Sequence, residues 1–105
     1  PNGFRHMNGY GSHTFKWVNA QGEEFLVKYH YKTDQGIKNF TGAESAAKGV
    51  ENKDWSTVDL HNEIKKGNFP SWTWYVQVMP IADADNYRFD VYDVTKIWPH
   101  SDYPL

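Results

Sequence analysis

Alternating apolar and polar residues mark the extended stretches of this chain. The alternation covers residues 12–18, 24–32 and 71–79, and a last extended stretch is expected at residues 94–98. A period of two is typical of half-buried β-strands. Residues 19–22 (NAQG) end in a glycine that can adopt a positive φ, so the first two strands are predicted to form a hairpin.

The alternation gives the second strand two different faces. Its apolar face carries Phe25, Val27, Tyr29 and Tyr31. Its opposite face carries Glu24, Lys28, His30 and Lys32, together with Leu26. One face is expected to be core, and the other to be wet or to line a site.

Two short helices are predicted between the strands. Thr41 and Glu44 have the spacing of a capping box at the start of an Ala-rich helix that Gly49 is expected to end. A second helix is expected to start near Ser56, with Asp59 as its capping partner. Two lysines and a glycine at 65–67 are expected to close it, because cations and glycine suit a helix C-terminus.

Composition narrows the fold class and the partners. The chain has 105 residues, enough for one domain, and 17% of them are aromatic, which favours β-structure. The net charge of −2, with both signs interspersed, offers no footprint for nucleic acid or an anionic membrane. The absence of Cys excludes disulfides and thiolate sites. No apolar run approaches the roughly 20 residues that span a bilayer, so we expect a soluble chain.

Short motifs give few chemical signals by themselves. The GYG of residues 9–11 leads into a strand and lacks the third glycine of a dinucleotide fingerprint, so a backbone bend is the better interpretation. The five histidines lack the spacings of zinc sites, and no nucleophile elbow is present, so neither a metal centre nor a hydrolase triad is predicted. His13 stands out because it shares a face with Phe15 and Trp17, where a polar ring usually has a buried partner.

Four longer motifs carry a specific resemblance. The segments are RHMNGYGSHTF, HYKTDQGIKN, PSWTWYVQVM and DVTKIWPHSDYPL. In this order they resemble the haem-containing catalases, over essentially all of residues 1–105. They match an interior part of that family's longer chain, the second half of its eight-stranded antiparallel barrel. The resemblance implies an α+β fold in which this partial core domain supplies about four barrel strands with short inserted helices.

The same resemblance implies a function for the longer protein. Haem catalases are oxidoreductases that disproportionate hydrogen peroxide to water and oxygen, which protects against oxidative stress. The full-length protein is therefore expected to hold haem, to form a homotetramer, and to be cytoplasmic or, in a eukaryote, peroxisomal. None of the motifs that carry the family's distal histidine and asparagine or its haem-ligating tyrosine falls within this chain. The isolated segment is expected to be inactive and, with an unpaired sheet edge, poorly folded.

Six residues match supporting positions of the family. His13 matches a histidine that contacts the arginine beside the proximal tyrosine and so helps to keep that tyrosine ionised. The other five match positions at which many members bind NADPH: Asn8, Tyr10, Lys32, Trp98 and His100. Lys32 and His100 suit phosphates, Asn8 and Tyr10 can hydrogen-bond, and Trp98 offers its backbone and an apolar wall.

Two features depart from the family pattern. Arg88 and Tyr92 have the spacing of the haem-ligating stretch, but their surroundings match the region before TKIWPH, so Tyr92 is interpreted as a turn aromatic. Residues 90–93 (DVYD) replace the common Asn-Pro-Phe-Asp and lack its rigid proline. An alternative without the resemblance is an aromatic-rich β-sheet module that binds a carbohydrate or a small apolar ligand. Its stacking platform would be Trp17, Trp72 and Trp74.

Overall fold

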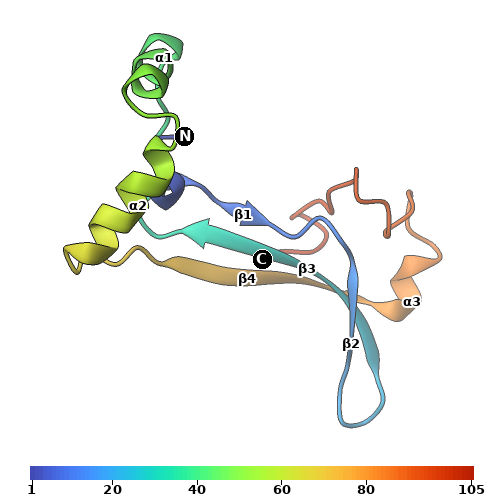
Figure 1. Ribbon diagram of the computed structural model, residues 1–105. Coiled ribbons are helices and arrows are strands. Elements are labelled where there is room, and N and C mark those ends of the chain that lie inside the picture. Colours follow the sequence, from blue (N-terminus) through green and yellow to red (C-terminus); the bar gives the residue numbers. More distant parts are fainter. The chain divides into compact units, whose positions relative to one another are not determined.

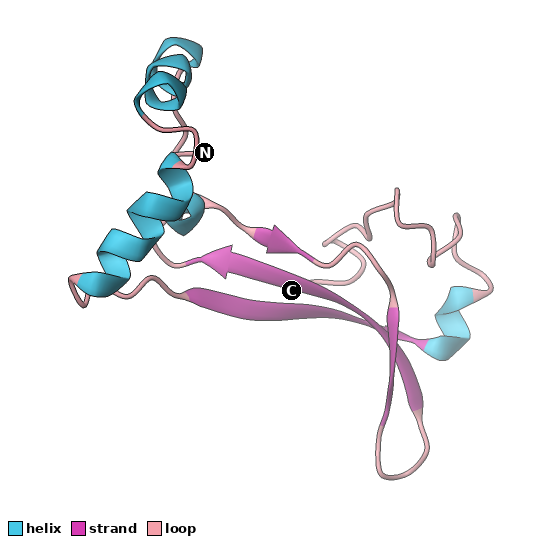
Figure 2. Cartoon of the chain, in the orientation of Figure 1, coloured by secondary structure: helices cyan, strands magenta, loops and turns pink.

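The computed structural model describes residues 1–105 (Figure 1). These residues divide into two compact units. Unit 1 contains residues 1–9 and 31–73, and unit 2 contains residues 10–30 and 74–105. Figure 2 distinguishes the helices from the strands. In chain order the elements are η1 (Phe4–His6), β1 (Gly9–Tyr10), β2 (Phe15–Val18), β3 (Glu24–Thr33), α1 (Gly42–Glu51), α2 (Trp55–Lys65), β4 (Trp72–Pro80) and α3 (Ile81–Ala84).

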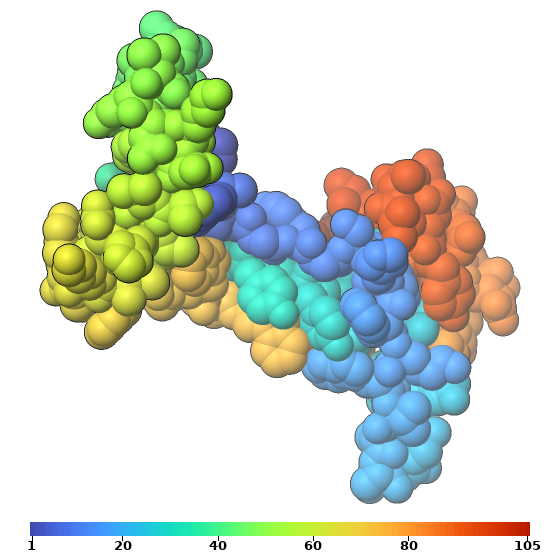
Figure 3. Space-filling view, viewed as in Figure 1, coloured from blue at the N-terminus to red at the C-terminus, as the bar shows by residue number.

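The predicted hairpin is confirmed, with a shorter first strand. β2 pairs antiparallel with β3, and Trp17 lies opposite Phe25. Gly22 has φ 80° at the end of the turn, and the tip of the hairpin stands clear of the rest of unit 2 (Figure 3). β2 begins at Phe15 rather than at residue 12. The residues before it contact β3 through single hydrogen bonds. The Gly11 N–H donates to the Tyr29 carbonyl, and the Lys28 ammonium donates to the Ser12 carbonyl.

The predicted sheet is present, and the fold class is confirmed. β3 lies between β1 and β2 in the strand order, and β4 also pairs with β3, giving four antiparallel strands with a few short helices. The sheet does not close into a barrel within these residues. The prediction of a strand at residues 94–98 is wrong. Side-chain caps turn the chain before it, since the Tyr92 N–H donates to Asp90 and the Thr95 N–H donates to Asp93.

The face of β3 that meets the core cluster of unit 2 is the polar one, although Val27 on the opposite face is also buried. Leu26, Met79, Val91 and Trp98 form the core cluster of unit 2. Lys28 and His30 share the face of Leu26, and they are only 5% and 8% exposed. The aromatic side chains Phe15, Trp17 and Trp74 are instead exposed. Alternation separates the two faces of a strand but does not say which of them meets the core.

The first helix is confirmed at its start and longer than expected at its end. The Thr41 hydroxyl accepts from the Glu44 N–H, and the Glu44 carboxylate accepts from the Thr41 N–H, which completes the capping box. The helix α1 then continues through Gly49 to Glu51. A single glycine weakens a helix without ending it.

The second helix keeps its predicted end but not its predicted cap. α2 begins at Trp55, and the residue before it, Asp54, makes no side-chain capping bond. Asp59 caps nothing and pairs instead with Arg5 of η1. Gly67 has φ 80° after the last turn, as a C-terminal glycine should. No helix in the structure combines the length and apolarity needed to cross a membrane.

Candidate functional site

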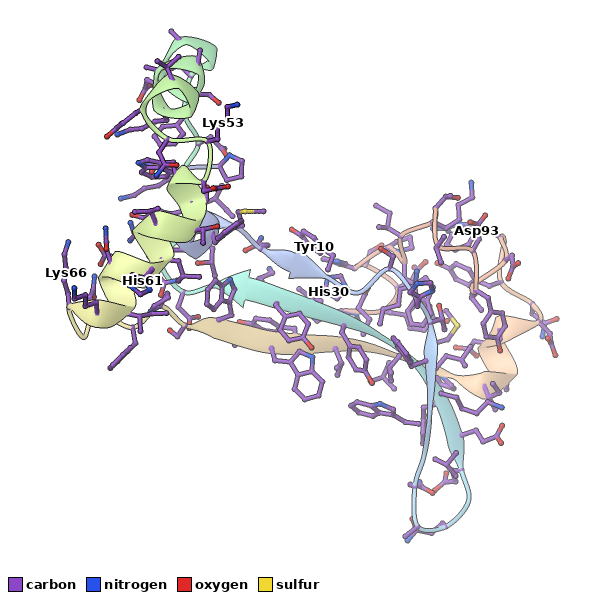
Figure 4. All side chains as sticks on the ribbon, in the orientation of Figure 1. Tyr10, His30, Lys53, His61, Lys66 and Asp93 are labelled. Atoms are coloured by element: carbon purple, nitrogen blue, oxygen red, sulfur yellow. The ribbon has the colours of Figure 1, made fainter.

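Three aromatic rings from distant parts of the sequence meet in unit 2. His30 on β3 lies between Tyr10 and His100, with its ring centroid 5.8 Å from that of Tyr10 and 5.6 Å from that of His100. Both contacts are edge to face, a favoured arrangement for aromatic rings. Figure 4 shows Tyr10 on β1 close to His30 on β3. The structure thus brings two of the sequence-predicted nucleotide residues, Tyr10 and His100, around a third ring that the prediction omitted.

A buried amide holds this ring cluster to the C-terminal segment. Gln77 on β4 is 1% exposed. Its Nε2 donates to the carbonyl of Trp98 at 2.9 Å and to the carbonyl of Tyr103 at 2.7 Å. Its Oε1 lies 2.8 Å from Nε2 of His30. One side chain therefore connects β4, β3 and residues 98–103.

Trp98 fills the core of unit 2 and is 1% exposed. Its indole Nε1 donates to the Val91 carbonyl at 3.2 Å, and its own carbonyl accepts from Gln77. The indole thus packs the interior, and the carbonyl keeps one lone pair for a further donor. The apolar surface expected from the Trp98 indole therefore faces the core of unit 2.

Lys28 supports Trp98 from β3. Its ammonium lies 5.5 Å from the Trp98 ring centroid and donates to the carbonyls of Ser12 at 3.2 Å and Lys96 at 3.0 Å. Burial lowers the pKa of Lys28, because a low-polarity environment disfavours the charged form, and the negative charge of Asp93 opposes that effect. Lys28 therefore connects the residues that precede β2 to the segment before Trp98.

Asn8 and Lys32 belong to unit 1. The Asn8 side-chain oxygen accepts from the Thr33 N–H at 2.9 Å, so this amide secures the end of β3. Lys32 is exposed. Asn8 also contributes to a largely apolar hollow of about 340 Å³, which is lined by Phe4, Met7, Asn8, Gly9, Tyr31 and Trp72. A single site that combines Asn8 and Lys32 with Tyr10, Trp98 and His100 remains a prediction.

The remaining sequence-predicted positions are exposed. His13 precedes β2 with its ring exposed, and its contact with an arginine of the family stays a prediction. Tyr92 is 53% exposed and lies in a turn capped by Asp90, as the interpretation of a turn aromatic requires. No group of three or more His, Cys, Asp or Glu side chains is arranged to hold a metal ion.

The predicted aromatic platform is only partly assembled. Trp17 and Trp74 lie in unit 2, with ring centroids 6.5 Å apart. Trp72 belongs to unit 1, where its Nε1 donates to the Met7 carbonyl at 2.8 Å. Trp72 is thus engaged within unit 1 and is not part of the contact between the other two indoles.

Sequence reasoning missed three buried polar residues: Lys28, His30 and Gln77. A signal for them existed, because all three interrupt alternating strands at positions that share a face with Leu26 or Met79. A polar side chain on an inward position is buried only when it has partners. Lys28 and Gln77 find partners in residues 96–103, which no local pattern linked to the strands, and His30 in turn bonds to Gln77.

Comparison with known proteins gives matches over the whole chain. The family model described as Catalase matches residues 1–105. The peroxisomal catalase of Toxoplasma gondii is 56% identical over 105 residues, which are 100% of this chain and 21% of that protein. The catalase of Streptomyces coelicolor is 55% identical over 105 residues, 100% of this chain and 22% of that protein.

Solved structures agree with these matches. A bacterial catalase has a TM-score of 0.96 at 51% identity, over 100% of this chain and 20% of that one. Catalase A from Saccharomyces cerevisiae has a TM-score of 0.95 at 46% identity, over 100% of this chain and 22% of that one. The chain spans about a fifth of the length of these relatives. With a family model that covers every residue, the chain belongs to the catalase family.

Proposed function

We propose that the full-length protein carrying this segment is a haem catalase that converts two molecules of hydrogen peroxide into two of water and one of oxygen. The observation that carries this proposal is identity of about 55% to proteins named catalase along all 105 residues. Because the matches cover the whole chain, no segment of it remains that could form a domain of a different fold. The comparisons give no support to the alternative of a carbohydrate-binding or apolar-ligand module.

The segment contributes support rather than the reacting groups. Haem supplies the redox chemistry of catalases when bound, and by the family resemblance none of the motifs that carry its tyrosine ligand falls within residues 1–105. By the family resemblance, His13 contacts the arginine beside the iron-bound tyrosine. A cation held beside that tyrosine favours its ionised form. We therefore assign His13 a positioning role.

The segment is also proposed to bind NADPH. Tyr10 and His100 meet at His30 in unit 2, where their rings and polar atoms can contact a dinucleotide. Lys32 is an exposed cation of the kind that pairs with phosphate. Asn8 lines a hollow in unit 1. These observations support four of the five proposed residues. The fifth, Trp98, has a buried indole and is proposed to offer only its backbone carbonyl, and the family resemblance supplies the nucleotide.

A direct test uses the full-length protein. It should show the Soret band of haem and release oxygen from peroxide, whereas the 105-residue segment should do neither. His13→Ala should lower turnover while the haem content stays unchanged. His61→Ala is the matched control, because His61 is exposed on α2 and has no proposed role. Unchanged turnover in His13→Ala would remove the positioning role but not the catalase assignment.

Nucleotide binding has its own test. Titration of the full-length protein with NADPH, followed by nucleotide fluorescence, gives a dissociation constant. Lys32→Ala should raise it several-fold, because one contact to a phosphate is worth about 1 kcal/mol or more. Lys53→Ala removes another exposed lysine of unit 1 and should leave it unchanged. Equal constants for the two variants would exclude Lys32 from the site.

The oligomeric state and the cellular location are also proposed from the family resemblance. We expect a homotetramer, which light scattering of the full-length protein measures directly. We also expect a cytoplasmic or a peroxisomal location; one relative is named a peroxisomal catalase. A role in the oxidative stress response predicts that cells lacking the protein are killed at lower peroxide concentrations.

A further inference from the structure

We propose that Gln77 is a positioning residue for nucleotide binding: its buried amide fixes His30 and the Trp98–Tyr103 segment, and thereby holds Tyr10 and His100 in place. This inference rests on the proposed NADPH site. It adds a residue that makes no contact with the nucleotide. All of the contacts involved lie within unit 2.

The orientation of the Gln77 amide is fixed by its neighbours. Both hydrogens of Nε2 are used, one on the Trp98 carbonyl and one on the Tyr103 carbonyl. A flipped amide would place Oε1 against these two carbonyl oxygens, with acceptors facing acceptors. Oε1 must therefore face His30.

This orientation also fixes the proton on His30. Since Oε1 can only accept, Nε2 of His30 must carry the hydrogen of the 2.8 Å bond. The bond holds the imidazole at one rotation about its side chain. A partner of defined orientation commonly selects the tautomer of a histidine in this way.

The held ring in turn contacts the two candidate nucleotide residues. Tyr10 and His100 each meet His30 edge to face, at 89° and 82° between ring planes. Such contacts depend on angle as well as distance, so rotation of His30 would disturb both. His100 is doubly fixed, because it follows Trp98 in the segment that Gln77 holds by its backbone.

Packing alone does not require an amide at position 77. Met79, two residues along on the same face of β4, is 0% exposed and belongs to the core cluster. A leucine or methionine would fill a site beside it without the desolvation that a buried amide must offset. The three hydrogen bonds of the amide instead fix the positions of His30 and of two backbone carbonyls, and a binding site needs its groups held in fixed positions.

The experiment measures the dissociation constant of NADPH in the full-length, haem-loaded protein. Gln77→Leu should raise the constant about tenfold, because it removes the bonds that position two contact residues. Met79→Ala is the matched control on the same strand and face. It should lower the melting temperature at least as much, through loss of core packing, and leave the constant within about twofold.

Coupling separates positioning from general destabilisation. His30→Leu should also raise the dissociation constant, and the Gln77→Leu, His30→Leu double variant should be no worse than the worse single variant. Where Gln77→Leu fails to fold, Gln77→Glu serves instead. It keeps the acceptor for His30 but sets a carboxylate oxygen against two carbonyls, and the same rise in the constant is expected.

Three results would overturn the inference. The first is an unchanged dissociation constant in Gln77→Leu, or in Gln77→Glu where that variant replaces it. The second is a rise matched by Met79→Ala at equal loss of melting temperature. The third is additive effects of Gln77→Leu and His30→Leu. A wild-type protein that binds no NADPH would overturn the nucleotide proposal itself and the inference with it, and this outcome differs from the other three because it appears before any substitution.

Discussion

The ion pair between Arg5 and Asp59 should hold η1 against α2 and so secure the segment that leads to Asn8. The guanidinium donates to both carboxylate oxygens, from Nε at 2.7 Å and from a terminal nitrogen at 3.0 Å. The two side chains are 19% and 13% exposed. The hydrogen bond to Asp59 raises the pKa of Arg5 above its ordinary value, against the opposing effect of burial. Arg5→Met removes the charge and keeps much of the apolar stem.

The expected size of the effect follows from this partial burial. Exposed pairs contribute about 0.2–1 kcal/mol, whereas breaking a fully buried pair costs about 3–5 kcal/mol. A bidentate pair that is mostly but not fully covered lies between these limits, at about 2 kcal/mol. By the usual conversion, this corresponds to a roughly 30-fold larger equilibrium constant for opening of the contact.

Hydrogen exchange followed by mass spectrometry measures this opening in the full-length protein. Arg5→Met should speed exchange in residues 55–65 about 30-fold, and Asp59→Asn should act similarly. Lys66→Ala is the matched control, because Lys66, the residue after α2, is 69% exposed and its pair with Glu63 of α2 spans 3.6 Å. We expect less than threefold there. A coupling energy between Arg5 and Asp59 below about 0.5 kcal/mol, from the double variant, would refute the reasoning.

Three further changes test single features of the structure. Thr41→Ala should weaken α1 by about 1 kcal/mol through loss of its cap, which faster hydrogen exchange in that helix would show. Thr57→Ala is the control, because Thr57 is exposed and lies inside α2. An effect of Thr41→Ala no larger than that of the control would contradict this. Gly3→Ala should disturb the ion pair, because its Cβ would lie 2.9 Å from Oδ2 of Asp59 at φ 83°; unchanged exchange in α2 would count against it. Burial, with help from Asp83, raises the pKa of Tyr103 to about 12. The folded state therefore keeps a proton that the unfolded chain loses near pH 10, so this contribution to stability is full below pH 10 and is lost as the pH rises to 12. Melting temperatures across this range should fall more steeply for the wild type than for Tyr103→Phe, and parallel curves would exclude the effect.

Local features of the fold were predictable from the sequence because the interactions that cause them are local. The hairpin turn at residues 19–22 and the capping box of Thr41 and Glu44 each involve residues within four positions of one another. The cap predicted for α2 failed for the opposite reason. Asp59 has a stronger partner in Arg5, 54 positions away, and no periodicity in the sequence reveals such a pair.

The candidate site was predictable only through resemblance, and only in part. Tyr10 and His100 were identified by the motifs that contain them, and the structure brings both to His30. His30 and Gln77 lie on strands whose alternation is clear, yet their importance depends on carbonyls of residues 98–103. The strand expected at residues 94–98 is absent, so the sequence pattern placed the Trp98 carbonyl in the wrong kind of structure, and no pattern addressed the Tyr103 carbonyl.

Because the polar face of β3 meets the core cluster, the aromatic rings on its other face have no layer packed over them in this chain. Tyr29 stacks on Phe15 at 5.2 Å and meets Trp74 at 5.5 Å, and the Trp17 indole donates to the Tyr29 hydroxyl. Three of these four rings are nevertheless at least 40% exposed. A contiguous aromatic surface of this kind is rarely left in water. Relatives of the chain are about five times longer, so we expect other parts of the full-length protein to cover this face. Lys28 and His30 on the polar face need no such cover, because their partners lie within residues 10–30 and 74–105.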